Sequence, residues 1–267
     1  GQSGDNLYFM VGALPSVTLG QGILVYNYAN IMEYPQVRQI GLNLQAKVAG
    51  VGIELIHSNF KVATPGVFGI RASYSVMPKL SIGASFVTDL NQLAGMPDSD
   101  GDDYPDYYDF YPDDVNKWDD QDEAENEWEG FNEFLTDQGY DALPDSKFNN
   151  WFKKSQFYNS YNPADTETDP ISGVALDAAY AISEKITLYS QFGLLLGEID
   201  TSIVDRSIYT DDIKLGWGLV PIGARAKLGP VNLLAEYRMG SRRFIFNYWD
   251  QAYDLNRVIV VDSIQTK

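Results

Sequence analysis

Apolar and polar residues alternate along most of this chain with a period of two. In residues 40–48, aliphatic side chains at every even position alternate with Gly41, Asn43, Gln45 and Lys47. The same alternation recurs in six further segments, at 68–76, 80–87, 174–180, 186–194, 213–219 and 231–239. Because successive side chains of a strand point to opposite faces, this pattern predicts β-strands with one apolar and one polar face.

We predict eleven strands, at about residues 5–13, 17–28, 37–48, 51–60, 67–77, 80–90, 171–182, 186–197, 212–228, 231–242 and 255–263. Most exceed the roughly five or six residues of strands in globular proteins and match the roughly nine to eleven that cross a bilayer at a tilt. Pro221 interrupts the alternation of its strand, so we expect a β-bulge there that returns the apolar side chains to their face.

Short and long connections also alternate. Short turns are expected at 14–16, 49–50, 77–79, 183–185 and 229–230, and long polar links near 29–36, 61–66, 91–170, 198–211 and 243–254. This layout is typical of bacterial outer-membrane barrels. It predicts an all-β, antiparallel, up-and-down transmembrane β-barrel formed by residues 1–90 and 171–267, with residues 91–170 as a long extracellular insertion.

Two points qualify the barrel prediction. Outer-membrane barrels generally have an even number of strands, so a count of eleven suggests a further strand before Gly1 and a fragmentary chain. A soluble all-β binding protein, such as a sandwich or a lipocalin-like barrel, would show the same alternation within its strands and is kept as an alternative. No apolar run reaches the length of a membrane-spanning helix.

Charged residues of both signs occupy the polar face, and in a barrel they would line the lumen. They are Lys47, Glu54, Arg71, Asp177, Lys214, Arg225, Lys227, Glu236 and Arg238. Such residues either pair with one another and fill a narrow barrel, or line a water-filled path for a small solute. The sequence leaves both possibilities open.

The net charge of −18 arises in one stretch of the chain. Residues 98–145 contain nineteen acidic residues and one lysine, whereas the rest has eighteen of each sign. With no basic cluster, the chain is not expected to bind nucleic acid. His57 is the only histidine, and its neighbour Ser58 would point to the opposite face of a strand, so the two cannot act as base and nucleophile. No catalytic site is predicted.

The acidic stretch opens with the run D-S-D-G-D-D-Y-P-D-Y-Y-D at residues 98–109. Five of its carboxylates are spaced as ligands for a cation: Asp98, Asp100, Asp102, Asp106 and Asp109. Crowded carboxylates repel one another, and Ca²⁺, which takes six to eight oxygen ligands, would remove that repulsion. Gly101 and Pro105 favour the tight turns that such a loop needs. The alternative is a solvated acidic loop that holds only counterions.

This run resembles the thrombospondin type 3 repeat, whose pattern is D-x-D-G-D-G-x-x-D-x-x-D, with Asp103 in place of the second glycine. The EF-hand pattern fits less well. Residues 109–122 are similar to the linker and the start of the next repeat in bacterial proteins that carry such modules. The resemblance covers about a tenth of the chain and implies calcium binding. Together with the strand pattern, it suggests a bacterial outer-membrane barrel with an inserted calcium-binding repeat.

Residues 123–135 place Trp128, Phe131, Phe134 and Leu135 at helical spacing, which predicts a short amphipathic helix. We expect a protein in the bacterial outer membrane, in contact with its lipids, with residues 91–170 at the cell surface. The barrel would anchor a module for adhesion or complex formation with a protein or polysaccharide. The alternative function is a porin-like channel that the acidic loop gates or caps.

Overall fold

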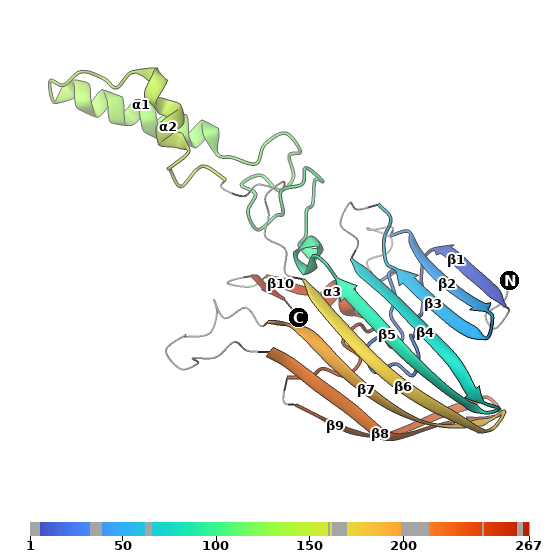
Figure 1. The fold of residues 1–267 in the computed structure, drawn as a ribbon. Helices are drawn as coiled ribbons and strands as arrows, with labels where there is room; N and C mark the ends of the chain where they lie inside the picture. Colours follow the sequence, from blue (N-terminus) through green and yellow to red (C-terminus); the bar gives the residue numbers. More distant parts are fainter. Residues whose placement is uncertain are drawn as a thin grey trace. The chain divides into compact units, whose positions relative to one another are not determined.

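The computed structural model describes residues 6–32, 39–61, 66–159, 161, 170–198, 214–241, 243–260 and 264–266. The chain divides into two compact units: Gly1–Gly95 with Thr168–Lys267, and Met96–Glu167. We call the first the sheet unit and the second the insertion (Figure 1). The ends predicted for the insertion were residues 91 and 170.

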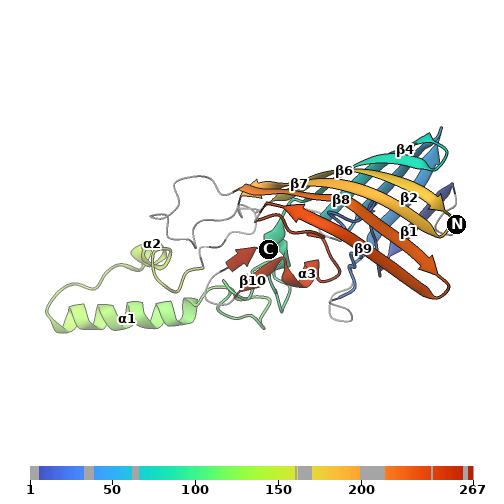
Figure 2. The same cartoon turned by 90° about the horizontal axis from the view of Figure 1, so that it is seen from below.

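Nine antiparallel strands form one sheet in the order of the sequence. They are β1 (Leu7–Gly12), β2 (Gly41–Val48), β3 (Val51–His57), β4 (Val67–Met77), β5 (Leu80–Asp89), β6 (Ile171–Ser183), β7 (Ile186–Glu198), β8 (Lys214–Leu228) and β9 (Val231–Gly240). The all-β prediction is therefore confirmed. Among the described residues, β1 and β9 each pair with one neighbour, so the sheet is curved but open (Figure 2).

The predicted alternation of short and long connections is confirmed from β2 onward. Two-residue turns at 49–50, 78–79, 184–185 and 229–230 join β2 to β3, β4 to β5, β6 to β7 and β8 to β9. All four turns lie at one end of the sheet, and the longer links leave from the other end (Figure 1). The insertion leaves β5 and returns to β6 at that second end.

The predicted strand at 17–28 and the turn at 14–16 are wrong. Residues 17–28 form a compact irregular segment closed by an isolated bridge between Val17 and Tyr28. Gly20 and Gly22 have φ values of +58° and +96°, which turn the chain away from an extended path. The count of eleven strands in one sheet is therefore also wrong, since the sheet of the described residues has nine.

The predicted strand at 255–263 is wrong in part. It begins as the short helix α3 (Tyr253–Asn256), which is followed by β10 (Val258–Val260). β10 pairs with β11 (Ile264–Thr266) and not with the nine-stranded sheet. Residues 261–263 lie outside the described part of the chain.

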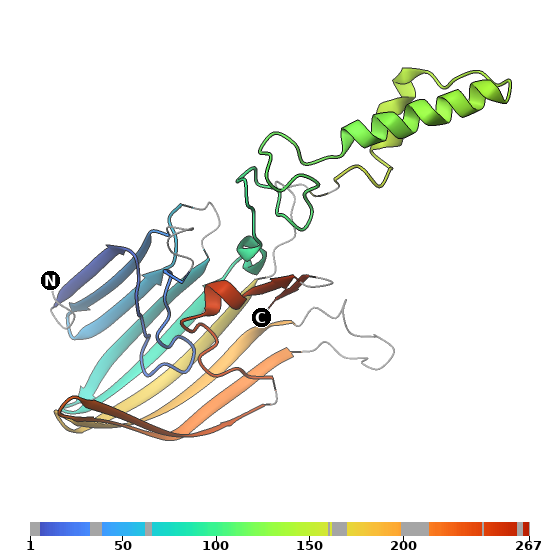
Figure 3. The same cartoon turned by 180° about the vertical axis from the view of Figure 1, so that it is seen from behind.

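Two segments, residues 13–30 and 243–257, lie on the concave face of the sheet, and we call them the inner layer (Figure 3). They are hydrogen-bonded to each other, with Trp249 N donating to Leu24 O at 3.1 Å and Asn247 N donating to Ile23 O at 2.9 Å. Fully buried inner-layer side chains fill the space against the sheet: Leu14, Val25, Tyr28, Tyr248, Trp249 and Tyr253. The core of the sheet unit lies between the sheet and this layer.

The β-bulge predicted at Pro221 is confirmed. Tyr189 pairs with Gly223 and Gln191 with Val220, so one residue of β7 opposes two residues of β8. The register with β9 shifts at the same place. As a result Ile222 returns to the outer face of the sheet, where 58% of its surface is exposed.

The insertion contains the predicted helix as α1 (Gln121–Asp137). Asp120 caps it by accepting a hydrogen bond from Glu123 N at 3.3 Å. The short elements η2 (Asp145–Lys147) and α2 (Phe148–Phe152) follow, and η1 (Gln92–Gly95) precedes the insertion. No helix in the described ranges combines the length and the hydropathy needed to cross a membrane.

The core of the insertion is small and aromatic. It consists of Ala124, Phe152 and Phe157, with Phe148, Trp151 and Tyr158 packed against them. Trp128 is also buried, whereas Phe131 and Phe134 are exposed. The apolar stripe expected on α1 is therefore only partly buried within the insertion.

Candidate calcium site

Three of the predicted ligands come together in the loop at the start of the insertion. Asp98, Asp100 and Asp102 each present a carboxylate oxygen, and these oxygens lie within 4.8 Å of one another. Oxygen ligands of Ca²⁺ lie about 2.3–2.6 Å from the ion. Oxygens that surround one ion are therefore separated by distances of this order.

Asp100, Asp102 and Asp109 each use one carboxylate oxygen to shape the loop. Their Oδ1 atoms accept hydrogen bonds from the backbone N of Asp102 (3.1 Å), Tyr104 (2.8 Å) and Tyr111 (2.8 Å), each two residues further along. Such bonds mimic a backbone turn and hold the loop in a tight curve. One carboxylate oxygen of each of these three residues thus orders the loop.

The remaining oxygens of these three residues are buried and have no hydrogen-bond donor in the described structure. They are Oδ2 of Asp100, of Asp102 and of Asp109. Buried polar atoms are nearly always paired, because an unpaired one loses its hydration without compensation. Three such oxygens in one loop are a set of acceptors that would fit a cation.

The pKa values of the loop carboxylates are also consistent with room for a cation. Burial, together with the charges of Asp102, Asp109 and Asp98, raises the pKa of Asp100. Burial and the charges of Asp102, Asp106 and Asp98 likewise raise the pKa of Asp109. The five carboxylates thus repel one another, and a bound cation would reverse the sign of that interaction.

Asp98 and Asp106 close the loop. Asp98 accepts hydrogen bonds from the backbone N of Gly101 at 2.8 Å and of Asp103 at 3.1 Å. Asp106 accepts from both the backbone N of Ser99 (2.7 Å) and its Oγ (2.8 Å), so both of its oxygens already have partners. Asp106 is not part of the group formed by Asp98, Asp100 and Asp102.

Two residues of the loop have positive φ angles. Gly101 has a φ of +81° and Asp103 a φ of +74°. Glycine adopts this left-handed region without steric cost, and aspartate is one of the residues that tolerate it. Asp103 therefore adopts a backbone conformation that glycine would also allow at this position.

The sequence did not predict the aromatic support of the loop. Tyr104 stacks on Trp118 with ring centroids 4.9 Å apart, and Tyr108 stacks on Tyr161 at 4.6 Å. Asp120, which caps α1, also accepts a hydrogen bond from Tyr111 OH at 2.7 Å. These aromatic contacts could have been predicted from the alternation of tyrosine with aspartate from residue 104 onward.

Polar residues of the sheet meet on its inner face, beneath the inner layer. Arg71 forms two hydrogen bonds to Asp177, at 2.8 and 3.0 Å, and a further ion pair with Glu54. Arg71 and Asp177 are buried. Gly83 lies between them, and a Cβ there would meet Arg71 Nη2 at 2.4 Å, so glycine is required for this contact.

A second network lies on β7, β8 and β9. Glu236 accepts hydrogen bonds from Tyr189 OH and from Arg238 Nε, both at 2.6 Å. Arg225 donates to the carbonyl of Gln21 in the inner layer at 2.6 Å. Six of the predicted lumen residues thus belong to paired networks that the sequence alone did not resolve.

The other three residues predicted to line the lumen are lysines near the ends of β2 and β8. Lys47 and Lys227 are exposed beside the two-residue turns. Lys214 begins β8, and its side chain lies outside what the structure describes. His57 packs its ring on Phe60, with centroids 4.3 Å apart, at the end of β3.

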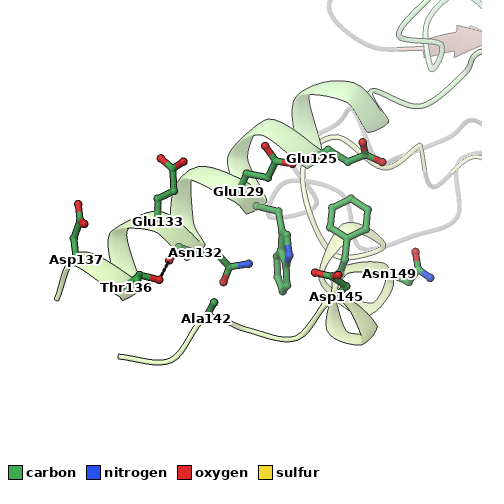
Figure 4. A pocket seen from close by; sticks show the side chains of 11 residues that line it. Glu125, Glu129, Asn132, Glu133, Thr136, Asp137, Ala142, Asp145 and Asn149 are labelled. Atoms are coloured by element: carbon green, nitrogen blue, oxygen red, sulfur yellow. Dashed lines mark hydrogen bonds between the residues drawn. The ribbon is translucent and has the colours of Figure 1, made fainter. Parts of the chain in front are cut away.

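A groove of about 910 Å³ runs along α1 in the insertion. Glu125, Glu129, Glu133 and Asp137 follow one another along the helix, and Asp145 lies across from them (Figure 4). The side chains of Trp128 and Phe148 also line the groove, and Trp128 Nε1 is buried without a hydrogen-bond acceptor in the described structure. Like charges four residues apart destabilise a helix, so a cationic partner would relieve repulsion here.

No protein-family model, no curated protein and no solved structure matches this chain. The function is therefore argued from the residues and their geometry.

Proposed function

We propose that this protein is a bacterial outer-membrane β-barrel protein that anchors a calcium-stabilised module at the cell surface. The observation that carries the proposal is the outer face of the sheet, which is apolar and exposed. Its exposed side chains include Leu176 (60%), Ile222 (58%) and Tyr237 (61%). The polar face of the same strands is the buried one.

This arrangement is the reverse of the usual one in water. Burying one large aliphatic side chain contributes about 1.5–3 kcal/mol, and soluble monomers rarely expose apolar patches beyond a few hundred Å². Exposed apolar side chains occur on every strand of the sheet except β3. A lipid environment would remove this cost over the whole face, whereas a protein partner would have to cover all of these strands.

The inner face supports an anchor better than a channel. The inner layer packs against the sheet, and the charged residues beneath it are paired with one another. A conducting path would need these residues to face water. Sustained single-channel currents in planar bilayers would contradict the anchor and favour the channel.

We place Ca²⁺ in the loop at residues 98–109 as a proposal that rests on the three unpaired buried oxygens. Asp98, Asp100, Asp102 and Asp109 would supply ligands, and Asp106 would support the loop through Ser99. The ion would offset the repulsion within an insertion whose aromatic core is small. The module would then present the acidic groove on α1 to a partner protein with exposed lysine or arginine side chains.

A calcium titration tests the calcium-stabilised module. The full-length protein, folded in detergent, is treated with protease in the presence of calcium or of a chelator. We expect calcium to protect residues 96–167, and Asp100→Ala to lose this protection. The matched control, Asp141→Ala, changes an exposed aspartate of the same insertion and should retain it. Equal cleavage with and without calcium would contradict the proposal.

Refolding tests the membrane anchor. The urea-unfolded protein is diluted into buffer alone or into buffer with phospholipid vesicles. We expect β-sheet circular dichroism and protease resistance of the sheet unit only when vesicles are present. A monomeric, soluble and protease-resistant product in buffer alone would instead favour a soluble all-β protein.

A further inference from the structure

Each of the four two-residue turns of the sheet carries a lysine. Lys79 and Lys185 lie within their turns, and Lys47 and Lys227 lie two residues before theirs. All four side chains are exposed. Since the turns lie at the same end of the sheet, the four residues form a row of positive charge. We call Lys47, Lys79, Lys185 and Lys227 the lysine rim.

The lysine rim has little opposing charge nearby. Within two residues of the four turns, Glu184 is the one acidic residue. None of the four lysines belongs to an ion pair in the described part of the chain, where Lys79 Nζ reaches only the carbonyl of Ile182, at 3.4 Å. The arginines of the inner face, by contrast, are paired. The rim is thus free to bind an anionic partner.

An exposed apolar side chain accompanies each lysine. Val48, Met77, Ile182 and Leu228 lie within three residues of Lys47, Lys79, Lys185 and Lys227, respectively, and are all exposed. A lysine stem can follow an apolar surface while its ammonium group reaches a more polar layer. Each turn therefore has a cation within three residues of an exposed apolar side chain.

The spacing of the rim indicates an extended anionic surface and not a single small anion. Neighbouring strands lie about 4.8 Å apart, so successive turns of this sheet are separated by about 10 Å. Four lysines at that spacing cannot converge on one phosphate. They can each contact a separate group on a surface that carries many.

We propose that the lysine rim binds the phosphate groups of anionic phospholipids in the leaflet that the short turns face. This inference rests on the proposed function, because it requires the sheet to lie in a bilayer. A lysine close to an anionic membrane surface strengthens binding by roughly fivefold. The rim would therefore fix the orientation and the depth of the sheet in the bilayer.

The test compares folding of the full-length protein in two kinds of vesicle, one of phosphatidylcholine alone and one with about a third phosphatidylglycerol. We expect phosphatidylglycerol to raise the folding equilibrium constant of the wild type, as measured by urea titration. In the rim variant the ratio of the folding equilibrium constants in the two kinds of vesicle should be at least tenfold smaller than in the wild type. The rim variant combines Lys47→Gln, Lys79→Gln, Lys185→Gln and Lys227→Gln. The control variant Lys117→Gln, Lys147→Gln, Lys153→Gln, Lys154→Gln, in the insertion, should keep the wild-type ratio.

Three outcomes would overturn the inference. They are an equal gain in the rim variant and the wild type, a gain that survives 1 M salt, and the same gain from inorganic phosphate added to phosphatidylcholine vesicles. The last result would assign the rim to a small anion. Failure of the wild type to fold in either kind of vesicle would instead contradict the proposed membrane anchor, so the two failures are distinguishable.

Discussion

The sheet unit and the insertion expose opposite kinds of residue. In the sheet unit the outer face is apolar and exposed, whereas Arg71 and Asp177 are buried. In the insertion the surface is acidic and the core is aromatic. The sheet unit carries sixteen acidic and fifteen basic residues, a net charge of −1, and the insertion carries twenty-one and four, a net charge of −17.

Under the proposed function, the difference means that one chain is suited to two solvents, lipid and water. The insertion buries apolar side chains and exposes charged ones, as proteins in water do. A bound cation would offset part of its excess negative charge. The sheet unit suits an apolar environment on its outside and keeps its polar groups for internal pairs. The most direct way to break this comparison is to make matched changes in the two units.

The largest effect is expected from Arg71→Ala. The substitution leaves Asp177 and Glu54 without their partner on the inner face, and loss of one member of a buried ion pair typically costs about 3–5 kcal/mol. Urea titration of the protein in vesicles would measure the free energy of unfolding. Arg238→Ala, which removes a more exposed partner of Glu236, should cost less than about 1 kcal/mol. Equal costs would mean that the inner network is not what stabilises the sheet.

The next largest effect is expected from placing a charge at an exposed apolar position, and it should differ between the two units. Leu176 and Phe134 are almost equally exposed, at 60% and 57%. If the sheet lies in a bilayer, Leu176→Arg should lower the free energy of unfolding in vesicles by about 2–4 kcal/mol. Phe134→Arg should change the stability of the insertion by no more than about 0.5 kcal/mol. Similar small values at both positions would argue that both surfaces face water.

A pair of backbone substitutions sharpens the account of the calcium loop. Gly101→Ala places a Cβ at a φ of +81° and should destabilise the calcium-bound loop by about 1 kcal/mol. Asp103→Gly, at a φ of +74°, should leave the stability unchanged or raise it slightly. Calcium affinity measured by isothermal titration calorimetry reports both. A loss at Asp103→Gly as large as that at Gly101→Ala would imply that the Asp103 side chain takes part in binding.

The smallest effect expected is a dependence on pH that calcium reverses. Without calcium, the raised pKa values of Asp100 and Asp109 mean that the folded loop binds more protons than the unfolded chain. Its stability should therefore rise as the pH falls from neutral toward these pKa values. With calcium, protons compete with the ion, so stability should fall over the same range. Hydrogen exchange of residues 98–111, corrected for its intrinsic pH dependence, would show whether the two trends are opposite.

The strands could be predicted because their signal is local. Alternation with a period of two identified β2 to β9, and even the bulge at Pro221 was visible as a change of phase. The prediction failed at residues 17–28, where Ile23, Leu24 and Val25 are successive buried residues of an irregular segment against the sheet. Gly20 and Gly22 were the sign that this segment is not extended.

The acidic loop and the networks on the inner face differ in how far apart their residues lie in the sequence. The carboxylates of the loop lie within twelve residues of one another, so their spacing alone indicates a shared cation. Arg71 and Asp177 are 106 residues apart, and their contact depends on the register of β4, β5 and β6 and on the space left by Gly83. The sequence identified these residues as polar and inward-facing but could not pair them.

The inner layer imposes an order on folding. Tyr28 and Asp254 are joined by a hydrogen bond of 2.9 Å although 226 residues separate them in the sequence. Residues 13–30 therefore lack their inner-layer partner until residues 243–257 have been synthesised and brought to the concave face. Contacts of such long range slow folding and leave hydrophobic surface exposed meanwhile. Assembly of this protein should thus be completed only when residues 243–257 dock on the concave face.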